Sequence, residues 1–185
     1  MNKIFICLLM AFLAHSFCTA QNLSKLIVGQ KESKTFGANK KHNFSIELKK
    51  GQFAVLNLEQ KKIDVKISTY NPNGKLIEEF DSLNGNSGDE MVLLDGLEDG
   101  KYRIEVVPFK EKKSKKGNYE IELIAINQNV REHVDQVLQT LDDRSNLPGF
   151  AASIVSKDTL LYQNTKRYAK IENKTPYTMQ TVQSV

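Results

Sequence analysis

The chain has 185 residues, of which 26 are Lys or Arg, 22 are Asp or Glu and 40% are hydrophobic. This composition excludes collagen-like, low-complexity and wholly disordered chains, and a net charge of +4 gives no case for nucleic-acid binding. The length allows one large domain, or a small domain with part of another.

Residues 1–20 have the pattern of a secretory signal peptide. Lys3 supplies a positive charge, residues 4–17 are mostly apolar, and Ala20 is a small residue suited to cleavage. The apolar run is shorter than the ~20 residues of a membrane-spanning helix, so we expect no transmembrane segment. The sequence therefore predicts a secreted or periplasmic protein that is cleaved after Ala20. Lipidation of Cys18 is the less favoured alternative, because the bulky Phe17 precedes it.

Both cysteines, Cys7 and Cys18, lie in this first segment. The mature protein is therefore expected to have no disulfide, no thiolate metal site and no cysteine nucleophile. Burial of apolar side chains must then supply its stability.

Short strands separated by turns are predicted from about residue 30 to residue 126. The turn at 70–74, Tyr-Asn-Pro-Asn-Gly, is well specified, because proline fixes φ while Asn and Gly tolerate the left-handed region. An antiparallel β-sandwich is the economical fold for residues 21–126. The seven predicted strands lie at residues 44–48, 52–58, 63–67, 75–80, 91–94, 102–106 and 119–125.

Several of these turns and strands resemble one family of modules. Gly-Gln-Phe-Ala-Val at 51–55, Asn-Pro-Asn-Gly-Lys-Leu at 71–76 and Asp-Gly-Lys-Tyr-Arg-Ile-Glu-Val at 99–106 are similar to the bacterial pre-peptidase C-terminal type of β-sandwich. The resemblance implies a jelly-roll-like accessory module of a secreted enzyme. Its motifs form turns and strands, so they imply a fold rather than a catalytic activity.

The periodicity changes at residue 127, where an α+β segment begins. A cap at Asn127 or Asn129 is expected to start a helix, and residues 142–146 are expected to end it. Two strands at 150–156 and 159–168 are predicted to form a hairpin through a tight turn at 157–158. The apolar face of the helix consists of Val130, Val134, Val137, Leu138 and Leu141.

This last segment carries a second resemblance. Pro-Gly-Phe-Ala-Ala-Ser-Ile-Val at 148–155, the hairpin, and Tyr-Ala-Lys-Ile-Glu-Asn-Lys-Thr-Pro at 168–176 are similar to the serine β-lactamase and penicillin-binding-protein-like hydrolases, near the class C type. The resemblance implies that residues 127–185 are the truncated N-terminal segment of such a domain. It also implies a parent enzyme that hydrolyses a β-lactam, a peptidoglycan-type peptide or an ester through an acyl-enzyme.

The catalytic residues of that family are not found in the chain. No serine is followed by lysine three residues later, and Ser184 lies just before the place where the resemblance expects the Ser-x-x-Lys motif. Tyr162-Gln163-Asn164 matches a Tyr-x-Asn pattern, but it precedes the missing serine and lies in a predicted strand. We therefore expect an inactive chain with no catalytic, cofactor-binding or metal residue.

Other polar features have structural interpretations. The loop at 81–90 has enough oxygen ligands for Ca²⁺, but it lacks the spacing of a known calcium loop, so a plain turn is favoured. Gly-Asn-Ser-Gly at 85–88 lacks the strand–helix setting of a nucleophile elbow. The basic run at 110–116 is predicted to be a solvated hairpin tip, and His42 and His133 are predicted to be isolated surface or helix-face residues.

Two functions remain open. The first is the front part of a secreted serine hydrolase, in which the sandwich is an accessory module. The alternative is a secreted, non-catalytic β-sandwich that binds a partner or a surface. In both cases residues 147–185 are expected to be loosely held, with the apolar face of Phe150, Ala152 and Ile154, or its alternate face, partly exposed.

Overall fold

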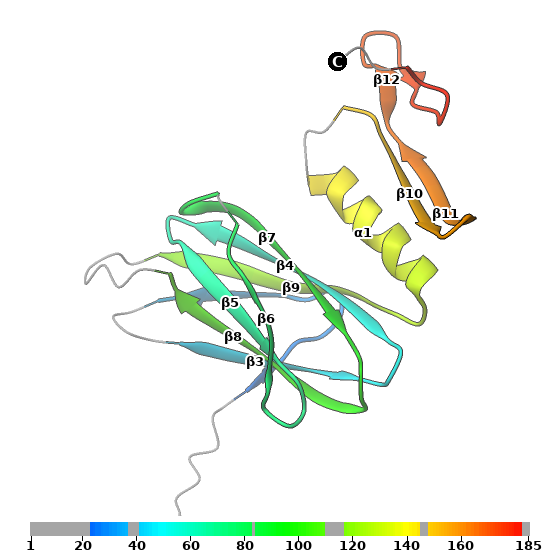
Figure 1. The fold of residues 1–185 in the computed structure, drawn as a ribbon. Helices are drawn as coiled ribbons and strands as arrows, with labels where there is room; N and C mark the ends of the chain where they lie inside the picture. The colour runs from blue at the N-terminus through cyan, green and yellow to red at the C-terminus, as the bar shows by residue number, and fades with distance from the viewer. Residues whose placement is uncertain (1–22, 37–40, 83, 110–116, 145–147, 183–185) are drawn as a thin grey trace, which may run out of the picture.

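The computed structural model describes residues 23–36, 41–82, 84–109, 117–144 and 148–182. One helix, α1 (Val130–Arg144), separates a group of nine strands from a smaller group of four (Figure 1). The smaller group consists of β10 (Phe150–Ser156), β11 (Thr159–Lys166), β12 (Tyr168–Lys170) and β13 (Thr175–Pro176). The larger group consists of β1 (Ser24–Lys25), β2 (Lys31–Thr35), β3 (His42–Leu48), β4 (Phe53–Lys61), β5 (Val65–Tyr70), β6 (Leu76–Phe80), β7 (Ser87–Asp95), β8 (Gly100–Pro108) and β9 (Asn118–Asn127).

The first nine strands form a β-sandwich of two sheets. One sheet has the order β1-β3-β8-β5-β6 and the other has the order β2-β9-β4-β7. Strands β2–β9 pair with one another in the antiparallel sense, whereas β1 pairs with β3 in the parallel sense. The distribution of β2–β9 over the two sheets is that of a jelly roll. The prediction of a mainly β chain with an antiparallel β-sandwich is confirmed.

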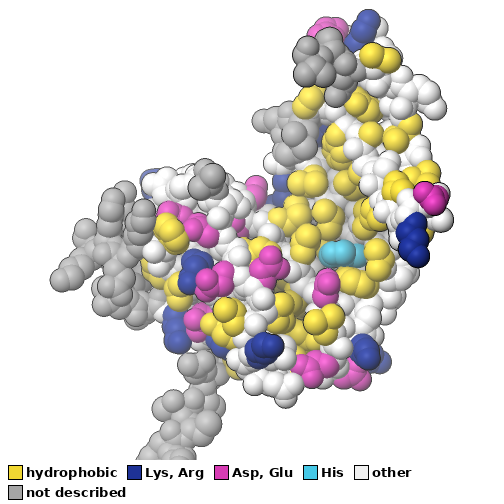
Figure 2. Space-filling view, viewed as in Figure 1, with side chains coloured by type: hydrophobic (Ala, Val, Ile, Leu, Met, Phe, Trp, Pro, Cys, Tyr) yellow, Lys and Arg dark blue, Asp and Glu magenta, His cyan; other side chains and the backbone are white. Residues whose placement is uncertain are grey.

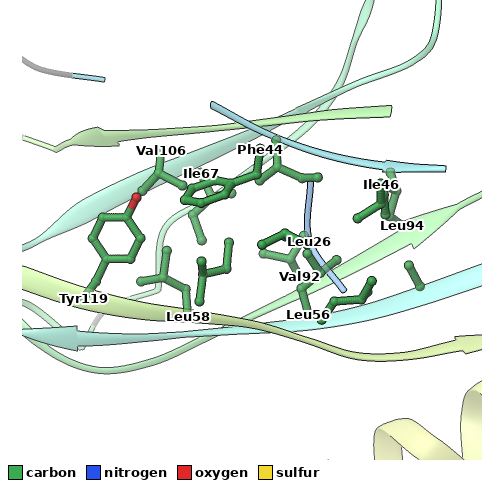
Figure 3. Packing of buried hydrophobic residues seen from close by; sticks show 14 of the residues in the cluster. Leu26, Phe44, Ile46, Leu56, Leu58, Ile67, Val92, Leu94, Val106 and Tyr119 are labelled. Carbon is green, nitrogen blue, oxygen red and sulfur yellow. The ribbon is translucent and has the colours of Figure 1, made fainter. Parts of the chain in front are cut away.

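The core lies between the two sheets, as expected when alternate side chains of each strand point inward (Figure 3). Phe44 and Ile46 of β3 face Leu56 and Leu58 of β4, and all four are almost completely buried. The two tyrosines of this core place their hydroxyl groups on polar partners: that of Tyr102 donates to the Glu98 carbonyl oxygen at 2.9 Å, and that of Tyr119 lies 2.8 Å from His42 Nδ1. Both tyrosines therefore contribute large apolar rings to the core, while each hydroxyl group has a hydrogen-bond partner.

The prediction of seven strands is wrong in two respects. It lacks β1 and β2, because the sequence of β2, Lys-Glu-Ser-Lys-Thr, has none of the apolar alternation of a half-buried strand. Pairing with β9 makes this charged segment an edge strand. The loop predicted between the strands at 75–80 and 91–94 is also too long, since β7 begins at Ser87.

Helix α1 begins with a reciprocal cap. Asn129 Oδ1 accepts the backbone N–H of Glu132 at 3.0 Å, while the Glu132 carboxylate accepts the Asn129 Nδ2 at 2.8 Å and the backbone N–H of Gln128 at 2.9 Å. These bonds satisfy donors that the first helical turn leaves without partners. Of the two predicted caps, Asn129 is the correct one. The second predicted strand of the hairpin is too long, because Arg167 has a φ of 59° and β11 ends at Lys166.

We expect Leu58→Ala to lower the free energy of unfolding by about 3 kcal/mol, because it leaves a cavity in the centre of the sandwich. Urea unfolding followed by far-ultraviolet circular dichroism measures this loss. Leu97→Ala is the matched control, since Leu97 is 70% exposed and its truncation should change stability by less than about 0.5 kcal/mol. Equal losses in the two variants would contradict the position of the core.

Candidate interaction surface

One face of helix α1 lies on the outer surface of the four-stranded sheet (Figure 1). His133 stacks on Phe53 of β4, with ring centroids 5.1 Å apart and ring planes 25° apart. At the other end of the helix, Arg144 Nη2 lies 2.9 Å from Glu122 Oε2 on β9, and Nη1 lies 3.6 Å from Asp89 Oδ1 on β7. A ring contact at the start of the helix and ion pairs at its end therefore hold the helix on the sheet.

The opposite face of α1 holds the hairpin through a buried tyrosine. The Tyr162 hydroxyl of β11 donates to Asp135 Oδ1 at 2.5 Å, and Asn164 Nδ2 lies 3.2 Å from the same oxygen. Burial raises the pKa of Tyr162, and the hydrogen bond to Asp135 acts in the same direction, so the hydroxyl stays a donor at neutral pH. The Tyr-x-Asn pattern at 162–164 thus joins the hairpin to the helix.

Two further contacts extend this attachment toward the end of β11. Lys166 Nζ donates to Gln139 Oε1 at 2.8 Å. The next residue, Arg167, forms an ion pair with Asp142 and also donates to the Asp142 carbonyl oxygen. With Tyr162, these residues attach one side of β11 along about two turns of the helix.

The other face of the hairpin is uncovered in the described part of the chain. Ile154 pairs with Tyr162 and Ala152 with Asn164, so these residues share the face toward α1. On the alternate face Val155 is 60% exposed, and the neighbouring Leu160 and Leu161 are also about half exposed. Figure 2 shows hydrophobic side chains gathered over this part of the molecule. The expected exposure of the alternate apolar face is confirmed.

A polar groove of about 510 Å³ runs beside α1. Its charged groups already have structural partners: Glu132 belongs to the helix cap, Asp135 binds Tyr162, and Lys166 binds Gln139. These contacts stabilise the helix and the hairpin rather than a reactive centre. The groove is lined by Asn127, Glu132, Asp135, Gln136, Gln139 and Lys166.

The acidic segment at 81–90 turns its last carboxylate inward. Glu90 is 1% exposed and accepts hydrogen bonds from Gln60 Nε2 at 2.9 Å and from the Ser82 hydroxyl at 2.6 Å. Among the described residues, no three His, Cys, Asp or Glu side chains are arranged to hold a metal ion. In the Gly-Asn-Ser-Gly sequence at 85–88, Ser87 and Gly88 belong to β7. The basic run at 110–116 and Ser184 lie outside the described residues.

The two described histidines occupy different structural settings. His42 stacks on Phe36, with centroids 4.4 Å apart, and its Nδ1 lies 2.8 Å from the Tyr119 hydroxyl. His133 lies between the helix and the sandwich, where burial lowers its pKa and the nearby Asp95 opposes that shift. The description of His133 as a helix-face residue is correct, but its ring contact depends on tertiary packing that no local pattern indicates.

Comparison with known proteins finds distant similarities to solved structures. No family model and no curated protein matches the chain. It is similar to the pre-peptidase C-terminal domain of a collagenase from Bacillus anthracis, with 11% identity, a TM-score of 0.45 and coverage of 55% of this chain and 94% of that one. It is also similar to PliG, a periplasmic inhibitor of g-type lysozyme from Aeromonas hydrophila, with 13% identity, a TM-score of 0.39 and coverage of 57% and 96%. The resemblance of 148–182 to serine hydrolases stays a prediction.

Within the residues that the structure describes, no helix combines the length and apolar character needed to cross a membrane.

We expect Tyr162→Phe to loosen the hairpin without unfolding the sandwich. The substitution removes the donor to Asp135 and costs about 1 kcal/mol, so tryptic cleavage after Lys166 should accelerate roughly fivefold. Tyr168→Phe is the matched control, because Tyr168 is 39% exposed on β12 and its substitution should leave the cleavage rate unchanged. Equal rates for both variants and the parent protein would contradict the role of Tyr162.

We expect attachment of α1 to weaken as the pH falls below about 6.5. Because the pKa of His133 is lowered in the folded state, the unfolded chain binds more protons below the ordinary value, so stability is complete above it and declines as pH falls. Urea unfolding of the protein and of His133→Gln between pH 7.5 and pH 5 measures this effect. The variant should lose less stability over that interval, and identical pH profiles would contradict the assignment.

Proposed function

We propose that the chain is a secreted, non-catalytic β-sandwich interaction module, which uses its four-stranded sheet to hold α1 and present the hairpin β10–β11 to a protein partner. The observation that carries this proposal is the division of the hairpin into two faces. One face is fixed to α1 through Tyr162, and the other exposes Val155, Leu160 and Leu161. A cluster of exposed apolar side chains on an element attached to a folded domain is typical of a protein-binding surface.

The polar groups of the described residues support a binding role rather than a catalytic one. Asp135, the carboxylate nearest to the buried Tyr162, accepts two donors from the hairpin. The buried Glu90 is bound by Gln60 and Ser82. Groups engaged in this way stabilise the fold, whereas a catalytic acid or base needs access to a substrate. Secretion rests on the signal-peptide pattern of residues 1–20.

Position-specific photo-crosslinking tests the binding role. A photo-reactive phenylalanine analogue at Leu160 is expected to form adducts with a polypeptide in the producing cells. The same analogue at Glu47, which is exposed on the outer face of the five-stranded sheet, is the control and should form none. Equal adducts from both positions, or none from Leu160, would refute the hairpin as the binding surface.

A second candidate function is favoured by the same hairpin. The helix and hairpin occur in the order that the resemblance to serine β-lactamases and penicillin-binding-protein-like hydrolases implies. Two strands packed on one helix are too few for an independently stable layer, so further strands of a larger domain would complete it. On this account the sandwich is an accessory module. The substrate of the parent enzyme would be a small-molecule β-lactam, a peptidoglycan-type peptide or an ester.

The two functions predict the same inactivity for this chain and differ in the coding sequence expected beyond Val185. Under both, the purified protein should not hydrolyse a chromogenic β-lactam or a p-nitrophenyl ester above the buffer rate, since the chain has no Ser-x-x-Lys motif. Measurable turnover that is abolished by an acylating inhibitor would contradict this expectation. Reading the coding DNA beyond Val185 separates them, because a Ser-x-x-Lys motif in frame within about twenty codons supports the hydrolase.

A further inference from the structure

Strand β10 differs from the edge strands of the sandwich in its charge. Its seven residues, Phe-Ala-Ala-Ser-Ile-Val-Ser, include no charged side chain and no proline. The edges of the sandwich are charged: β2 has Lys31, Glu32 and Lys34, β6 has Glu78 and Glu79, and β7 has Asp89 and Asp95. Charged edge strands resist pairing with another chain, whereas a neutral edge offers its N–H and C=O groups without that barrier.

The other edge of the hairpin is less suited to pairing. The register of the hairpin shifts between Ile154 and Val155, which leaves Leu161 as an extra residue of β11. The Leu161 carbonyl oxygen accepts a hydrogen bond from Arg131 Nη2 at 3.3 Å, and the Thr165 N–H donates to Asn164 Oδ1 at 2.8 Å. A bulge and local hydrogen bonds therefore occupy β11, and β10 is the more open edge.

We infer that β10 pairs with β10 of a second copy of the chain, in antiparallel orientation, to form the four-stranded sheet β11-β10-β10-β11. The neutral edge is complementary to itself, because an antiparallel pair places no charges opposite each other along its seven residues. With the twofold axis at Ser153, each Ala151 lies opposite Val155 of the second copy, so small and larger exposed side chains alternate across the junction.

This pairing closes at two copies. Both chains use the same strand, so the contact is isologous and leaves no second β10 edge for a third copy. It also changes the hairpin from two strands, which are marginal alone, to a sheet of four strands with a helix attached to each half. Because the twofold axis runs through the sheet, each Tyr162–Asp135 contact stays within its own chain.

The inference rests on the proposed function, since it names the partner that the hairpin binds. The two fail differently. A protein that is monomeric, yet forms adducts with other polypeptides from Leu160, would overturn the second copy and leave the binding role intact. A dimer in which Leu160 forms adducts with a second copy of the chain and with no other polypeptide would retain the pairing and identify the second copy as the partner.

Charged substitutions at Ser153, on the predicted twofold axis, test the register of the β10–β10 pair. Sedimentation velocity of the purified protein over a range of concentrations should show a monomer–dimer equilibrium. Ser153→Lys should weaken dimerisation by about tenfold or more, because two like charges then lie opposite each other, and Ser153→Asp should do the same. An equimolar mixture of the two variants should recover the dimer. Ser33→Lys on the charged edge strand β2 is the matched control and should leave the association unchanged.

A disulfide at the same position tests the contact directly. Opposite residues of an antiparallel pair have Cα atoms about 4.5–5.5 Å apart, which is within the reach of a disulfide. Ser153→Cys in the mature protein, which is expected to have no other cysteine, should therefore oxidise to a covalent dimer, and Ser33→Cys should remain mostly monomeric. A monomer at all concentrations, or a dimer that is unaffected by Ser153→Lys, would overturn the inference.

Discussion

Helix α1 has two contact faces, and the arrangement of everything after the sandwich depends on both. Toward the sandwich it presents His133 to Phe53 and Arg144 to the carboxylates of β7 and β9. Toward the hairpin it presents Asp135 to the Tyr162 hydroxyl. Fifteen residues thus connect a large, well-buried core to a small sheet that has little core of its own. The hairpin is therefore connected to the sandwich through this helix, which contacts β11 on one side and β4 and β9 on the other.

The two parts that α1 connects are stabilised in different ways. The sandwich buries apolar residues from both of its sheets, and the hydrophobic effect over that area is the main source of its stability. The hairpin depends instead on a few polar contacts with the helix, each of which contributes about 1 kcal/mol. Its uncovered face leaves apolar surface available to a partner. A stable sandwich that presents a less stable, partly apolar element is well suited to interaction, because binding can order that element.

The sequence predicts the parts of the fold in which side-chain chemistry and local structure agree. Alternation at Phe44, Ile46 and Leu48 indicates β3, and the Asn-Pro-Asn-Gly sequence at 71–74 indicates the turn before β6. Charged β2 carries no such signal, because it becomes a strand only through its pairing with β9. Propensity and pattern describe a segment by itself, whereas an edge strand of this kind is defined by its neighbour.

The candidate surface was harder to predict for the same reason. An exposed hairpin face follows from the sequence, since two short strands and one helix bury little area. The contact between Tyr162 and Asp135 does not, because the two residues are 27 positions apart and belong to different periodic patterns. From the sequence alone, His133 is an ordinary polar residue of a helix. Its contact with Phe53 of β4 depends on the packing of the helix on the sheet. Residues that join separate elements are the ones for which a linear pattern carries least information.

Amide hydrogen exchange of the whole protein, resolved by segment, tests the central claim most directly. Strands β3, β4, β8 and β9 should exchange only through global unfolding, because they enclose the core. Peptides from α1 should show intermediate protection, and at concentrations where the protein is monomeric those from β10 and β11 should exchange fastest among the regular elements. That gradient is the result expected if the helix attaches a weakly held hairpin to a stable sandwich. Equal protection in the sandwich, the helix and the hairpin would contradict the account.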